Sequence, residues 1–501
     1  MAIDDQLGTD ADAAAGAAGT GADPARVGAG ERTVPGPEPR LAASQQRATM
    51  PTVALFVGLT ALSALIFWPA IRTGFFIDDF GYLGVTQQDR WWTSPMLRDL
   101  SAQVLRPVTV IAIGVQQALF GYDALRFHLV ALGLLTASGV LLHQVARRLG
   151  VGAFGAGAAA AVFMLHSTHG WALAWTASTS SLWVVTIALA MLLVVAAPEL
   201  TRRRQVAACV LLVVALLTRE IAIMLPFVAI AVRWAFVEGG ARTRLRRAVR
   251  ECSPFLVVLG VFLAARVGAA VYARSQPTDD RLIPILDLTS FSKAWPMVPD
   301  HLYTVSVLPT SPFDASLAGS GDQGFVFPAP VLVVAALVWV AVLVLVVREA
   351  RAGRFAAPIG LAWFLLAVIP PVFLQPEIAY GNYADLALPG FALAIGAGVG
   401  SLVAGRSKGL RVGVAVVGIA VLAVVGHLGG TTLFDPPPPP VQRARQLEAQ
   451  MLRDYPDPPT GSTVVVRNSI PEDQLWTSNG DQFRVMYGDP TLQVVFESPA
   501  P

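Results

Sequence analysis

Charged residues are scarce in this chain: they make up 14% of its 501 residues, whereas hydrophobic residues make up 54%. Soluble domains carry roughly a quarter charged residues, so this composition excludes an ordinary soluble domain. Only two cysteines are present, Cys209 inside an apolar run and Cys252 at the start of another, and neither a disulfide nor a cysteine metal site is expected. A net charge of +2 and the lack of a basic stripe with interleaved aromatics give no indication of nucleic acid as a partner.

Long apolar runs recur along the sequence instead. About 20 apolar residues span the hydrocarbon layer as a helix, and these runs are continuous rather than alternating, which favours helices over a barrel. The predicted fold class is an all-α polytopic membrane protein with about eleven transmembrane helices. The expected spans lie near residues 52–72, 126–146, 152–167, 174–197, 205–218, 220–237, 254–273, 329–347, 356–374, 384–404 and 411–431.

Clusters of basic residues set the expected orientation. They lie at 147–148, 202–204, 242–250, 348–354 and 406–411, all on one side if the spans alternate. Cytoplasmic loops are enriched in Lys and Arg, so this side is the cytoplasm. The sequence therefore predicts a multi-pass plasma-membrane protein with a cytoplasmic N-terminus and an extracytoplasmic C-terminus. The long loops 73–125 and 274–328 then face outward.

Four parts are expected along the chain. Residues 1–48, rich in Ala, Gly, Pro and Thr, form a disordered cytoplasmic tail rather than a cleavable signal peptide. Residues 49–434 form the membrane domain, and 435–440 a stiff polyproline linker. Residues 441–501 form a small α+β extracytoplasmic module. Its sequence predicts a helix over Val441–Arg453 and strands over Thr463–Val466 and Leu492–Phe496.

Two adjacent carboxylates, Asp78 and Asp79, follow the first apolar run. Charges beside the hydrocarbon layer are costly, so such a pair is a functional hypothesis by default. Under the predicted topology, polar residues of mixed chemistry collect at the same outer face. They are Arg106, His128, His166, His169, Arg219, Glu220, Tyr380, Asn382 and Tyr383. Inner turns carry mostly basic residues, so this mixture indicates a site.

A series of short motifs runs in order through residues 52–405. The motifs are Phe76-Ile77-Asp78-Asp79, Arg106-Pro107, Phe120-Gly121-Tyr122, Phe127-His128-Leu129, Phe163-Met164-Leu165-His166, Trp175, Leu217–Ala222 and Tyr383 with Leu388-Pro389-Gly390. Together they resemble the GT-C-type membrane glycosyltransferases. The likeness is greatest to the protein O-mannosyltransferases and the tetratricopeptide-coupled transmembrane O-mannosyltransferases.

This resemblance implies transfer of a sugar, a mannose-like hexose or a pentose, from a polyprenyl-phosphate donor to an extracytoplasmic acceptor. The acceptor is a protein, a lipid or a cell-wall glycan, and membrane lipids surround the enzyme. An acidic residue of the first outer loop acts in such enzymes as general base or helps to bind a metal. The resemblance assigns that role to Asp78 as the first candidate and to Asp79 as the second. No cofactor is certain, and a divalent cation, Mg²⁺ or Mn²⁺, is left open.

The chain also departs from the family pattern. Ser167 and Trp171 stand where the family has Pro and an acidic residue, and Ser178–Ser181 replace an Arg-x-Asp sequence. Arg219 stands where Lys is common, and no tetratricopeptide repeats follow the membrane part.

The proposed chemistry needs a base and a cation. A carboxylate that takes the proton of the acceptor hydroxyl contributes typically ~10²–10⁴-fold, and Asp78 is the candidate. Asp79 would orient it, cap a following helix or share a metal. Arg219 and Arg106 are candidates to stabilise the leaving phosphate, because guanidinium suits phosphate geometry. The alternative for Arg219 is a structural salt bridge with the adjoining Glu220.

The histidines leave two interpretations open. His128, His166 and His169 could bind phosphate, acceptor or metal, or could be hydrogen-bonded residues at span ends. A non-catalytic polytopic protein, either a transporter or lipid-handling protein or a degenerate scaffold, is the alternative to an enzyme. Transporters commonly show inverted repeats and broken helices near the midplane, and the absence of both patterns from the sequence favours the enzyme.

Overall fold

The computed structural model describes residues 49–88, 92, 94, 97, 105–274, 329–374 and 385–498, and the chain is helical through most of these ranges. The membrane part contains α1 (Thr49–Ile66), α2 (Trp68–Ile71), α3 (Asp78–Gln87), α5 (Pro107–Phe120), α6 (Ala124–Arg148), α7 (Ala153–Met164), α8 (His169–Ala174), the 3₁₀ turn η2 (Thr176–Thr179), α9 (Ser180–Val195), α10 (Arg202–Thr218), η3 (Glu220–Met224), α11 (Leu225–Trp234), α12 (Ala241–Arg274), α16 (Ala329–Arg351), α17 (Ala356–Leu374), α18 (Leu388–Leu402) and α19 (Lys408–Phe434).

Five of the described helical segments are long and apolar enough to cross a membrane by length and composition. They lie within residues 124–148, 176–195, 241–269, 333–351 and 408–429. Shorter apolar helices of 10–17 residues accompany them, among them α7 and α18. The prediction of a mostly helical chain with helices able to span a membrane is thus confirmed, and the number of eleven crossings stays a prediction.

Two helices occupy the loop that the sequence left without structure between the first two expected spans. α3 begins at the acid pair, and α5 begins at Pro107 after Arg106. Proline is favoured at the first turn of a helix, where its missing N–H costs nothing. With 14 residues, α5 is too short for the 20 that a span needs, and it packs against α3 and α10. The described residues of the first loop are therefore folded against the rest of the molecule.

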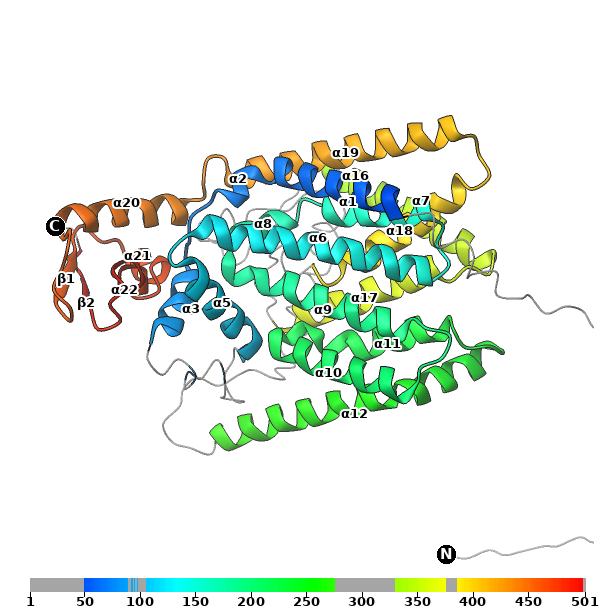
Figure 1. Cartoon of the computed structure of the whole chain (residues 1–501), viewed down its shortest axis with the longest axis horizontal. Helices are drawn as coiled ribbons and strands as arrows, with labels where there is room; N and C mark the ends of the chain where they lie inside the picture. The colour runs from blue at the N-terminus through cyan, green and yellow to red at the C-terminus, as the bar shows by residue number, and fades with distance from the viewer. Residues whose placement is uncertain are drawn as a thin grey trace, which may run out of the picture. The chain divides into compact units, whose positions relative to one another are not determined.

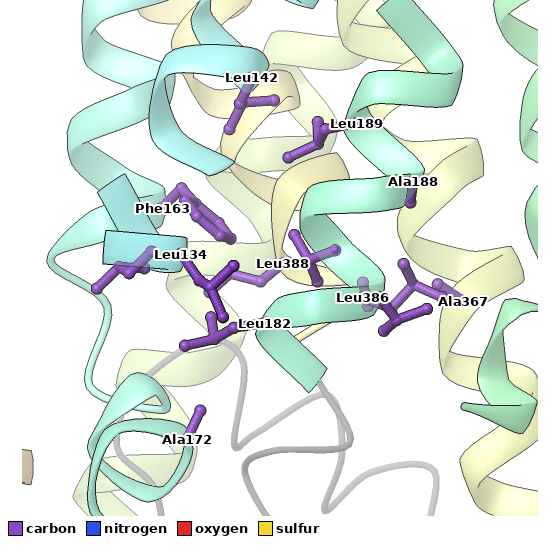
Figure 2. Packing of buried hydrophobic residues seen from close by; sticks show 14 of the residues in the cluster. Leu134, Leu142, Phe163, Ala172, Leu182, Ala188, Leu189, Ala367, Leu386 and Leu388 are labelled. Atoms are coloured by element: carbon purple, nitrogen blue, oxygen red, sulfur yellow. The ribbon is translucent and has the colours of Figure 1, made fainter. Parts of the chain in front are cut away.

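The core lies where α6, α7, α9 and α18 meet. Figure 2 shows Leu134 of α6, Phe163 of α7, Leu182 of α9 and Leu388 of α18 turned toward one another, and all four are buried. Without a hydrophobic effect between helices in lipid, close packing has to hold such helices together. The large side chains of this region therefore interdigitate in the interior rather than face lipid.

α7 and α18 approach each other through glycine. A Cβ atom on Gly396 would lie 2.5 Å from the Gly155 carbonyl oxygen, and one on Gly155 would lie 2.6 Å from the Gly396 carbonyl oxygen. Only glycine permits this backbone approach, which is how small residues allow membrane helices to associate.

The C-terminal residues form a module with its own core. It contains α20 (Pro439–Asp454), β1 (Thr463–Val466), α21 (Pro471–Trp476), α22 (Asp481–Tyr487) and β2 (Gln493–Phe496). The two strands pair in parallel, and the buried cluster comprises Leu447, Met451, Val464, Val466, Phe483 and Leu492. Within the unit 51–501, α21 and α22 lie beside α3 (Figure 1). The C-terminal module thus contacts the first loop.

Replacing Gly396 by alanine should separate α7 from α18 and lower the free energy of unfolding by about 1–3 kcal/mol, as overpacking does. The measurement is thermal unfolding of the purified protein in detergent. Gly413→Ala on α19 is the control, because open space surrounds that position in the described structure and alanine favours helix. Equal unfolding temperatures for the two variants would contradict the close contact.

Candidate active site

The acid pair follows a strained turn. Ile77 has φ 51° and ψ −120°, the dihedral angles of the first central residue of a type II′ turn, and the Asp79 N–H donates to the Phe76 carbonyl at 3.2 Å. Glycine is preferred at this position, and a β-branched residue there costs about 1–3 kcal/mol. Surrounding contacts must hold such a conformation. Strained backbone conformations cluster at functional sites, so the turn is a reason to examine the adjoining acid pair as a site.

The Asp79 carboxylate is enclosed by protein and bound to backbone. Its side chain is fully buried, Oδ1 accepts the Ala177 N–H at 2.7 Å, and Oδ2 accepts the Phe76 N–H at 3.3 Å. Burial raises the pKa of Asp79 well above its usual value, while these N–H groups act in the opposite direction. Asp79 therefore ties η2 to the turn and has no face open to a substrate.

Asp78 lies at the same helix start with the opposite exposure. Its side chain is exposed, and the carboxylate makes no hydrogen bond to any described residue. The protein atoms around it still raise its pKa above the usual value, and the Arg106 guanidinium opposes that rise. An accessible carboxylate with a raised pKa is suited to take a proton from a substrate.

Arg106 and Glu220 form an ion pair beside Asp78. Arg106 Nη2 lies 2.6 Å from Glu220 Oε1, and its Nε donates to Oε2 at 3.2 Å. Glu220 therefore pairs with Arg106 and not with the adjoining Arg219, which corrects the alternative drawn from the sequence. Tyr82, which sequence reasoning missed, lies in the field of Asp78, Arg106 and Glu220, and burial raises its pKa. Asp78, Arg106 and Glu220 form the charged part of the site, and Tyr82 adds a neutral phenol.

Arg219 lies deeper than the sequence led us to expect. Its side chain is buried, and Nη1 donates to the hydroxyls of Ser180, at 3.4 Å, and Ser181. These serines belong to the stretch that replaces the family's Arg-x-Asp sequence. They supply neutral acceptors to Arg219 in that place.

His169 forms a buried pair with Asp385. Its Nε2–H donates to the Phe163 carbonyl at 2.8 Å, and its Nδ1 lies 3.1 Å from Asp385 Oδ1, with both side chains fully buried. Sequence reasoning did not single out Asp385. The available signal was an acid at the start of an apolar run, where charge is costly.

The other two candidate histidines, His128 and His166, bond to groups within the fold. His128 Nδ1 contacts the Ile71 carbonyl at 2.9 Å, and His166 Nδ1 accepts the Thr168 N–H at 3.3 Å. Tyr383 lies outside the described residues. The structure thus brings Asp78, Arg106 and Glu220 together, while His128 and His169 are buried in contacts within the fold.

The described residues hold no ready-made cluster of ligands for a divalent cation, and Mg²⁺ or Mn²⁺ stays an open prediction. No three acidic, histidine or cysteine side chains gather among them, and the carboxylates beside Asp78 already bind other groups. Asp79 accepts two backbone N–H groups, and Glu220 binds Arg106. No step of the chemistry is therefore assigned to a metal.

Comparison with known proteins identifies the fold. No protein-family model matches the sequence, and no curated protein matches it. The oligosaccharyltransferase of Archaeoglobus fulgidus tethered with an acceptor peptide superimposes with a TM-score of 0.51 at 14% identity, over 89% of this chain and 64% of its own. ArnT from Cupriavidus metallidurans bound to undecaprenyl phosphate superimposes with a TM-score of 0.49 at 16% identity, over 89% of this chain and 86% of its own.

These identities show the fold alone, and this chain spans 64% of the length of the Archaeoglobus enzyme. The GT-C glycosyltransferase fold is nevertheless the one that the sequence motifs implied. The likeness to the O-mannosyltransferase group within that fold stays a prediction.

Replacing Asp79 by alanine should leave the N–H groups of Ala177 and Phe76 without acceptors. Buried unsatisfied groups of this kind cost about 1–3 kcal/mol, so the thermal unfolding temperature should fall. Asp79→Asn keeps one acceptor oxygen, so its unfolding temperature should fall less. An Asp79→Ala protein as stable as the wild type would contradict the structural role of this carboxylate.

Proposed function

We propose that the chain is a membrane glycosyltransferase that moves a sugar from a polyprenyl-phosphate donor to an extracytoplasmic acceptor, with Asp78 as general base. One observation carries the proposal: in a GT-C fold, the exposed carboxylate Asp78 begins the first-loop helix, has a raised pKa and lies in the electrostatic field of the Arg106 guanidinium. The motif series supports a mannose-like hexose or a pentose as the sugar. A protein, lipid or cell-wall glycan is the acceptor.

The reaction assigns one event to each participant. The acceptor hydroxyl gives its proton to the Asp78 carboxylate while its oxygen bonds to the anomeric carbon of the sugar. The bond from that carbon to the phosphate oxygen breaks, and polyprenyl phosphate leaves with the electron pair. The transition state has oxocarbenium character, as in other glycosyl transfer. A neutral hydroxyl is a poor nucleophile, which is why the base is required.

The positive groups have different parts in this proposal. The Arg106 side chain is 11% exposed and is held by Glu220, so its guanidinium lies at a fixed place beside the base. The guanidinium favours the ionised form of Asp78 and attracts the donor phosphate toward the site. Arg219 is buried and donates to the serine hydroxyls, so it stabilises the fold around the site.

The Asp78→Asn variant should lose transfer activity by ~10²–10⁴-fold, the usual contribution of a general base. The assay follows labelled sugar from polyprenyl-phosphate donors in proteoliposomes. Asp123→Asn is the matched control, because Asp123 is a partly exposed acid of the same loop that pairs with Arg126. Transfer that survives in Asp78→Asn at normal expression would refute the assignment.

The transfer rate should fall as the pH is lowered, because Asp78 must be ionised to act as a base. The midpoint of this acid limb should lie above the usual pKa of an aspartate, because the pKa of Asp78 is raised. Arg106→Gln removes a charge that lowers this pKa, so the limb should move to higher pH. Glu220→Gln breaks the same ion pair but leaves the guanidinium, so the limb should move to lower pH. Shifts in the same direction for both variants would show that ion-pair loss, not charge, governs the base.

A further inference from the structure

The strained residue before the acid pair is held by the C-terminal module. The Ile77 N–H donates to the Trp476 carbonyl at 3.1 Å, and the Ser478 hydroxyl donates to the Ile77 carbonyl at 2.8 Å. Both partners come from the end of α21 and the turn that leads to α22. The C-terminal module thus contacts both backbone polar groups of Ile77, a non-glycine residue with positive φ, and the Ile77 carbonyl also accepts the Phe80 N–H at 3.1 Å.

The turn that supplies these contacts is itself fixed. Ser478 and Asn479 have φ 50° and 56°. The Thr477 hydroxyl donates to the Asp473 carbonyl at 2.7 Å and accepts the Gly480 N–H at 3.2 Å. Asp473 is fully buried and takes two hydrogen bonds from Arg443, at 2.8 Å and 2.7 Å. Preorganised groups of this kind hold a neighbour without paying further ordering entropy.

The contact continues along α3. A Cβ atom on Gly84 would lie 2.8 Å from the Asp481 side chain, and one on Gly81 would lie 3.4 Å from the Ser478 hydroxyl oxygen. Gln87 Nε2, near the end of the helix, donates to the Val485 carbonyl at 3.2 Å. The C-terminal module therefore covers one face of α3 from its first turn to its last. α3 lies in a fixed place as a result.

We propose that Ser478 and the Trp476 carbonyl are positioning groups for the acid pair. They hold the turn at Ile77, and the turn directs Asp79 into the fold and leaves Asp78 accessible. Ser478 touches neither substrate nor the reacting atoms, and it acts through Ile77. The kinetic consequence rests on the function proposed above, whereas the structural hold can be tested without any substrate.

Hydrogen exchange tests the hold in the full-length purified protein. Ser478→Ala removes one of the two donors to the Ile77 carbonyl and leaves the Phe80 N–H. Exchange in the segment 74–83, which contains the Asp79 amide, should become about tenfold faster, which corresponds to the loss of one hydrogen bond. Ser469→Ala is the matched control, because that hydroxyl donates only within the module, to the Ile470 carbonyl. Equal exchange in Ser478→Ala and wild type would overturn the proposal.

A second substitution separates positioning from general loss of stability. Glycine adopts positive φ without cost, so Ile77→Gly removes the strain that Ser478 opposes. In the Ile77→Gly background, Ser478→Ala should therefore change the exchange of segment 74–83 much less than in the wild-type background. Effects of equal size in both backgrounds would show that Ser478 only stabilises the module, and would overturn the positioning role.

The transfer assay supplies the kinetic measurement. Ser478→Ala should lower kcat by about tenfold with an unchanged KM for the donor, and Ile77→Gly should recover part of the loss. An unchanged kcat beside faster exchange would overturn positioning for catalysis. Absence of transfer by the wild-type protein from every polyprenyl-phosphate sugar tested would refute the proposed function, and the exchange result would then decide the structural hold alone.

Discussion

The hydrogen bond from the Ala177 N–H to the Asp79 carboxylate is the contact on which the site depends. It joins the helix of the first loop to the 3₁₀ turn that begins α9, two segments 98 residues apart in sequence. A buried carboxylate is costly unless its oxygens accept hydrogen bonds. This contact therefore holds the Asp79 carboxylate in one position. One acid of the pair thereby becomes part of the framework, and its neighbour is left accessible at a defined place.

The surroundings divide the two chemically identical groups. Asp78 is exposed and lies in the field of Arg106, whereas Asp79 is fully buried among backbone donors. The strained conformation of Ile77 produces this division, because it sets how the chain enters α3. Two groups from the C-terminal module satisfy Ile77. The proposed base therefore depends on contacts from both the membrane helices and the chain terminus.

Much of the fold could be predicted from the sequence, because apolar runs of span length have few alternatives to helices. The acid pair and Arg106 could be singled out as candidates, since charge next to a membrane segment is conspicuous. The folded first loop was missed, because α5 is too short to read as a span. Asp385 was missed because its partner His169 is remote in the sequence.

Other parts of the site could not have been predicted. A positive φ at Ile77 leaves no mark in an amino-acid pattern, and isoleucine argues against it. The exchange of partners, in which Glu220 binds Arg106 while Arg219 binds serine hydroxyls, depends on tertiary packing. Adjacent charges in a sequence are a poor guide to such pairs, because neighbouring side chains point in different directions.

The most direct test measures transfer and thermal unfolding on the same preparations of Asp78→Ala and Asp79→Ala. We expect a crossed result: Asp78→Ala loses transfer at an unchanged unfolding temperature, and Asp79→Ala unfolds at a lower temperature. Unimpaired transfer in Asp78→Ala, or a stable Asp79→Ala protein, would contradict the division of roles between the two acids.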